Sequence, residues 1–219
     1  MPPSAGPAVA VRTYPDAVTR ERFVALATGR TMALAGDTFD YTLIERSIFV
    51  PTNRTHRYYV TDAAGATVAW LGPSNPVEPV EKPWYRYLLF GGMFAPDGQL
   101  LRQYEHGAQG RTAILDAEIK PRSWLVLFKF KLTISVGQQV IGGLDAQKFR
   151  PYDPIAVVAT DGRLIATIQR LQFDRDRLYA SRGARTRITL TENACAWPPH
   201  ALLMLVPALD HVCEFHSNS

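Results

Sequence analysis

The feature that most constrains this sequence is an unbroken apolar run near its C-terminal end. Residues 201–206 read Ala-Leu-Leu-Met-Leu-Val, and at about 100° per residue such a run covers every face of a helix. A helix over residues 198–215 would be roughly 27 Å long, and Pro207, Asp210 and His211 interrupt its apolar character. A bilayer span needs about 20 largely apolar residues. We therefore expect a helix buried in a protein core.

The rest of the sequence must then form a container for this helix. The chain has 219 residues, of which 47% are hydrophobic, enough for one sizeable core. We expect residues 14–219 to form a single domain, after a proline-rich, disordered tail over residues 1–13 that has nothing to bury. The helix side chains predicted to fill the core are Leu202, Leu203, Leu205, Val206 and Leu209.

Apart from one short helix near the N-terminus, the body reads as strands. An apolar stripe that includes Phe23 and Leu26 predicts a helix capped by Asp16 and ended by Gly29. Over residues 30–190, short runs rich in Val, Ile, Tyr, Phe and Thr alternate with Gly, Pro and Asp. This pattern is typical of strands joined by turns.

Turns containing Asp and Gly separate several pairs of these runs. Residues 57–71 read as strand, turn and strand, and residues 155–170 repeat the pattern around Asp161-Gly162. A weaker copy lies around Asp97-Gly98. Asp-Gly is a strong hairpin signal because the turn requires a positive φ, which glycine adopts without steric cost. Three such hairpins predict a meander or a closed barrel.

The clearest single strand covers residues 124–136. Apolar side chains share one parity there, whereas Lys129, Lys131, Thr133 and Ser135 share the other, as in a strand with one wet face. The dry face must contact something, and in a sheet closed into a barrel the apolar helix can fill that position. We therefore expect a mainly β fold, a single closed antiparallel barrel that encloses the C-terminal helix.

This arrangement resembles a known family. The residues that carry the resemblance are Tyr58, Val60, Asp62, Gly65 and Val68 in a Tyr-x-Val-x-Asp-x-x-Gly-x-x-Val hairpin, then residues 164–168 and the ending 201–210. They resemble the Tubby C-terminal-like superfamily, in particular phospholipid scramblases and LURP-one-related proteins, over about residues 31–215. The resemblance implies a barrel of twelve strands around the C-terminal helix. It also implies phosphoinositide binding, lipid scrambling or a signalling role.

No enzyme, metal or other cofactor is expected. The sequence has no Gly-x-Ser-x-Gly or His-Glu-x-x-His motif, and residues 137–143 lack the Lys-Ser/Thr of a phosphate loop. Residues 174–177 begin like a calcium loop, but Leu178 replaces the next oxygen ligand. Helical spacing places His211 and Cys213 on different faces, which disfavours zinc. An exposed loop is the expected position of Glu105 and His106.

Basic residues give the one positive functional indication. The formal net charge is +4, which favours anionic partners in general. The candidate headgroup-binding residues are Lys129, Lys131, Arg175, Arg177, Arg182, Arg185 and Arg187. Together they can hold anionic headgroups through charge-assisted bonds. A simpler explanation is that strands need solvated faces and edge charges that prevent aggregation.

These observations predict a non-enzymatic barrel that binds anionic phospholipid or associates peripherally with a membrane. The alternative is a protein-interaction or signalling module that presents loops such as residues 72–83 to a protein partner. Nucleic acid is not favoured. Cys195 and Cys213 are expected to be free thiols about 27 Å apart, and the N-terminus lacks the features of a signal peptide, so we expect a cytoplasmic protein.

Overall fold

The computed structural model describes residues 17–50, 53–62, 64–72, 90–107, 110–122, 129–147, 153–172 and 183–215. The predicted tail over residues 1–13 and the predicted cap at Asp16 lie outside these ranges. So do residues 73–89, which include most of the proline-rich segment considered as a protein-binding loop.

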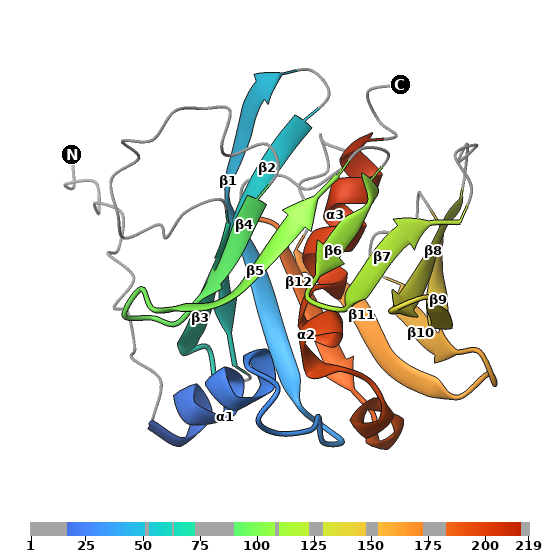
Figure 1. Ribbon diagram of the computed structural model, residues 1–219. Helices are drawn as coiled ribbons and strands as arrows, with labels where there is room; N and C mark the ends of the chain where they lie inside the picture. The colour runs from blue at the N-terminus through green and yellow to red at the C-terminus, as the bar shows by residue number, and fades with distance from the viewer. Residues whose placement is uncertain are drawn as a thin grey trace, which may run out of the picture.

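Twelve antiparallel strands within the described residues form a closed barrel (Figure 1). Each strand pairs with the next along the chain, and β1 pairs with β12 to close the barrel. The strands are β1 Thr38–Val50, β2 Asn53–Thr61, β3 Thr67–Gly72, β4 Phe90–Phe94, β5 Leu100–His106, β6 Thr112–Ile114, β7 Ala117–Pro121, β8 Lys129–Val136, β9 Gln139–Gln147, β10 Ile155–Ala159, β11 Leu164–Gln172 and β12 Arg185–Leu190. The predicted mainly β, closed-barrel fold is confirmed.

The three hairpins predicted from Asp and Gly turns are present as β2–β3, β4–β5 and β10–β11. In the last two, the glycine has a positive φ, 92° at Gly98 and 86° at Gly162. The aspartate before each glycine accepts a backbone hydrogen bond from the residue two positions on, at 3.1 Å in both turns. The side chain therefore stabilises the turn that the glycine makes possible.

The apolar C-terminal segment lies inside the barrel, where Figure 1 shows α3 surrounded by strands. Its predicted core side chains are at most 2% exposed: Leu202, Leu203, Leu205, Val206 and Leu209. The prediction of one continuous helix is wrong, however. The segment forms α2 Pro199–Leu203 and α3 Leu205–Phe215, with Met204 between them.

Pro207 explains this break in physical terms. In a regular helix the backbone N–H of residue 207 would donate to the carbonyl oxygen of Leu203, but proline has no N–H and its ring crowds that carbonyl. The hydroxyl of Tyr41 in β1 donates to the Leu203 oxygen instead, at 2.6 Å. Tyr41 is 1% exposed, so the strand wall supplies, inside the core, the hydrogen bond that the proline removes.

A short N-terminal helix, α1 Ala17–Ala27, packs at one end of the barrel beside α2 (Figure 1). Phe23 and Leu26 are buried, and the Phe23 ring lies edge-on to Phe39 of β1 with centroids 5.3 Å apart. Gly29 follows with a φ of 73°, as predicted for a glycine that ends a helix. A 3₁₀ turn, η3 Glu192–Ala196, connects β12 to α2.

The wet and dry faces predicted for residues 124–136 are present in β8 only in part, because Ser135, predicted on the wet face, is 6% exposed beside an irregularity in the β8–β9 register. Leu132 and Ile134 are buried towards the helix, whereas Lys131 is exposed on the outer wall. The observed strand begins at Lys129, and residues 123–128 lie outside the described ranges. Across the described ranges, we find no helix with both the length and the apolar character needed to cross a bilayer.

Candidate functional site

An ion pair between Asp210 and Arg170 attaches α3 to the inner wall of the barrel. The carboxylate of Asp210 accepts hydrogen bonds from Arg170 of β11 and from the Tyr58 hydroxyl of β2, the latter at 2.9 Å. The side chain of Asp210 is 3% exposed and that of Arg170 is 12% exposed. Burial alone would lower the pKa of Arg170, but the Asp210 carboxylate holds it above its usual value. Asp210 therefore acts as a hydrogen-bonded structural carboxylate.

Two histidine rings stack beside this ion pair. The rings of His106 and His211 have centroids 4.4 Å apart, and His211 Nε2 lies 3.1 Å from the Gly107 carbonyl oxygen. His106 Nδ1 lies 2.8 Å from the Thr112 hydroxyl. Burial, with the charges of His211 and His56, keeps the pKa of His106 well below its usual value, so this imidazole is neutral at pH 7.

The expectation of an exposed loop at Glu105 and His106 is wrong, because both residues belong to strand β5. Glu105 lies 3.4 Å from Arg111 and His106 turns towards α3, so the two side chains have separate partners. No group of three or more His, Cys, Asp or Glu side chains in the described ranges is arranged to hold a metal ion. Cys195 is an exposed free thiol and Cys213 a buried one.

Two of the predicted arginines meet on the outer wall around one aspartate. Arg185 and Arg187 of β12 both donate to Asp40 of β1, with Arg187 Nε 2.7 Å from Oδ1 and Arg185 Nε 3.0 Å from Oδ2. Asp40 is fully buried, whereas the arginine side chains are 40% and 35% exposed. We call these three residues the arginine clamp. Strand pairing explains it, because Asp40 lies directly opposite Arg187 in the β1–β12 register.

The clamp remains charged over the whole physiological range. Burial alone would raise the pKa of Asp40, but hydrogen bonds from Arg187 and Arg185 and their positive charges bring it below its usual value. The same interaction raises the pKa of Arg187. Two guanidinium groups share one carboxylate, so the clamp carries one net positive charge that faces outward.

The other predicted headgroup residues are not all described. Arg175, Arg177 and Arg182 lie outside the described ranges, and so does the side chain of Lys129. Lys131 is on the outer wall as predicted, with its Nζ 3.2 Å from the Asp145 carboxylate. Lys131 therefore does not join the arginine clamp. It belongs to a second feature of the outer wall.

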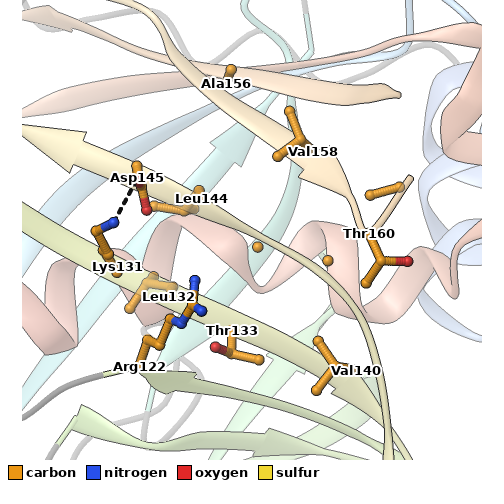
Figure 2. A pocket seen from close by; sticks show the side chains of 13 residues that line it. Arg122, Lys131, Leu132, Thr133, Val140, Leu144, Asp145, Ala156, Val158 and Thr160 are labelled. Carbon is orange, nitrogen blue, oxygen red and sulfur yellow. Dashed lines mark ion pairs between the residues drawn. The ribbon is translucent and has the colours of Figure 1, made fainter. Parts of the chain in front are cut away.

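That feature is a trough across β8, β9 and β10 with a volume of about 660 Å³ (Figure 2). Gly142 and Gly143 of β9 are among the residues that line its floor. The walls and ends are formed by Arg122, Lys131, Thr133, Val140, Asp145, Ala156, Val158 and Thr160. Figure 2 shows the Lys131–Asp145 ion pair at one end and Val140 and Thr160 towards the other.

Comparisons with known proteins leave the family open. No protein-family model and no curated protein sequence matches the chain. A search of solved structures finds an X-ray structure of an Arabidopsis thaliana protein, AT5G01750, with a TM-score of 0.45 and 9% sequence identity. The match covers 84% of this chain and 94% of the other. A likeness at this level carries no argument about function.

The sequence analysis did not identify the residues that complete the arginine clamp and the trough. Asp40 is 145 residues from Arg185 in the sequence, so nothing local marks it as their partner. Gly142 and Gly143 carried a usable signal, because paired glycines inside a strand indicate a bend or a close approach of backbone.

Proposed function

We propose that this protein is a non-enzymatic barrel of the scramblase-like or LURP-one-like type that associates peripherally with anionic phospholipid. The single observation that carries the proposal is the arginine clamp. Arg185 and Arg187 contact Asp40 through Nε and Nη2, and within the described ranges Nη1 of each guanidinium makes no hydrogen bond. A phosphate or carboxylate headgroup is the acceptor that such a donor pair favours.

The position and charge of the clamp support this role. Both arginine side chains are more than one third exposed, and Asp40 beneath them fixes the orientation of their guanidinium groups. A preorganised arginine loses less side-chain entropy on binding than a free one. Each cation near an anionic membrane surface contributes about 1 kcal/mol to association, so one clamp arginine corresponds to roughly a five-fold effect.

Co-sedimentation with vesicles tests the proposal. Vesicles of phosphatidylserine and phosphatidylcholine should bring the full chain down at low salt, and binding should weaken steeply as salt shortens the Debye length to about 10 Å at 0.1 M. Arg185→Gln should reduce the bound fraction, because it removes one of the two cations of the clamp. The barrel should stay folded, because Arg187 still pairs with Asp40. The matched control is Arg163→Gln, an exposed arginine that pairs with Asp161 in a turn.

Reversing both clamp charges would be a poor test, since it would leave Asp40 buried and repelled by its neighbours. Absence of sedimentation at low salt, or equal sedimentation with phosphatidylcholine alone, would contradict the lipid proposal. The protein-interaction alternative would then become the leading one, and its suggested loop over residues 72–83 would be the first segment to replace.

A further inference from the structure

The trough on the outer wall has the size of a small-molecule site. Its volume of about 660 Å³ falls in the range of roughly 300–1,000 Å³ that is usual for ligand pockets. Along β9, from Val140 to Asp145, it extends for about 15 Å at the rise per residue of a strand. A single extended chain or a ring system fits such a length.

Two glycines in the floor of the trough lie where a side chain would collide with neighbouring backbone. A Cβ on Gly142 would lie 2.2 Å from the carbonyl oxygen of Val158, and one on Gly143 would lie 2.2 Å from that of Leu132. Neighbouring backbone therefore approaches β9 from both sides. The packing of the barrel therefore requires both glycines, and a Cβ on Gly142 would also lie 2.7 Å from the ring of Trp197, which is buried.

The floor offers no free edge to a peptide. β9 is hydrogen-bonded to β8 on one side and to β10 on the other, and β10 is also bonded to β11. Addition of a further strand needs unpaired main-chain groups, which these central strands lack. The occupant must be recognised by side chains.

Those side chains divide the trough into an apolar part and a charged end. Val140 and Val158 are 47% and 37% exposed and form apolar walls, helped by Ala156. At the other end Arg122 and Lys131 provide two cations against the one carboxylate of Asp145. The side chain of Arg122 makes no ion pair within the described ranges, so this end keeps one positive charge that is not neutralised.

We infer that the trough binds one molecule of a single-chain anionic amphiphile, with a carboxylate or phosphate head at Arg122 and Lys131 and an apolar chain along Val158 and Val140. The head replaces water around two partly exposed cations, and the chain removes two valine side chains from solvent. This site does not depend on the arginine clamp or on the proposed binding of vesicles.

Isothermal titration of the full chain with dodecyl ligands, kept below their critical micelle concentrations, tests the inference. Dodecanoate and dodecyl phosphate should each bind with one molecule per chain. Dodecyltrimethylammonium should not bind, because it places a cation against Arg122 and Lys131. Inorganic phosphate alone should not bind either, because it leaves the apolar walls uncovered.

Two variants locate the site, each with a matched control. Arg122→Gln should weaken dodecanoate binding up to about five-fold, as expected for a partly exposed ion pair. Val158→Gln should weaken it roughly three- to ten-fold by removing an apolar wall without changing charge. Arg163→Gln and Leu164→Gln replace the same residue types outside the trough and should leave the affinity unchanged. All four positions are exposed, and thermal melts check that the variants are folded.

Equal binding of the cationic ligand, several molecules per chain, or unchanged affinity in Arg122→Gln and Val158→Gln would each overturn the inference. The vesicle proposal fails separately. Arg185→Gln should keep full affinity for dodecanoate while its vesicle binding is reduced. Arg122→Gln should weaken dodecanoate binding while its vesicle binding is kept.

Discussion

Two carboxylates of this barrel are almost completely buried, yet they serve opposite sides of its wall. Inside, Asp210 of α3 pairs with Arg170, whose side chain is 12% exposed. Outside, the fully buried Asp40 pairs with Arg185 and Arg187, which are 40% and 35% exposed. The inner pair has no surplus charge and attaches the helix. The outer cluster has one surplus positive charge on two partly exposed arginine side chains.

This difference predicts that substitutions on the inner and the outer wall have different effects. Within the described ranges, the inner wall packs against α2 and α3, so substitutions there should act on folding. The outer wall contains both the clamp and the trough, so substitutions there should act on binding.

The largest effect is expected from a charge placed in the core. Leu205→Asp should abolish folding, because Leu205 is fully buried and an unpaired charge there costs several kcal/mol, against a total stability of about 5–15 kcal/mol. Leu100→Asp is the exposed control, since Leu100 is 46% exposed, and it should change stability by no more than about 0.5 kcal/mol. Circular dichroism melts measure both. A cooperative melt of Leu205→Asp would contradict the buried position of α3.

The two arginine–carboxylate groups should differ in the next largest effect. Arg170→Gln leaves Asp210 buried with Tyr58 as its remaining partner and should cost about 3–5 kcal/mol in urea denaturation. Arg185→Gln leaves Arg187 on Asp40 and should cost about 1 kcal/mol or less. Similar costs for the two variants would show that inner and outer pairs are equivalent.

How much of this could be predicted from the sequence depends on the range of the interaction. The buried helix, the hairpins and the barrel follow from local patterns such as residues 201–206 and Asp161-Gly162. The Arg185–Asp40 contact and the trough depend on which strands become neighbours, and no local sequence pattern predicts the pairing of strands. The break before α3 lies between these cases, because Pro207 marked it but the apolar run outweighed the proline in our interpretation.

A smaller effect on stability is expected at the break between α2 and α3. Tyr41→Phe removes the hydroxyl that donates to the Leu203 carbonyl and should cost about 1–2 kcal/mol, as for a buried acceptor left unpaired. Pro207→Ala restores a backbone N–H that can donate to the same oxygen. In the Pro207→Ala background, Tyr41→Phe should therefore cost clearly less, which a double-mutant cycle in urea measures. Additive effects would show that the two groups do not serve the same carbonyl.

The two free thiols allow the most direct test of the enclosed helix. Cys195 is exposed in η3, whereas Cys213 is 7% exposed in α3 within the barrel. In the native protein, the thiol reagent DTNB should titrate one thiol per chain rapidly, and a Cys195→Ser variant should react only slowly. In guanidinium chloride the unmodified chain should release two equivalents. Rapid reaction of both thiols in the native protein would contradict a C-terminal helix sealed inside the strands.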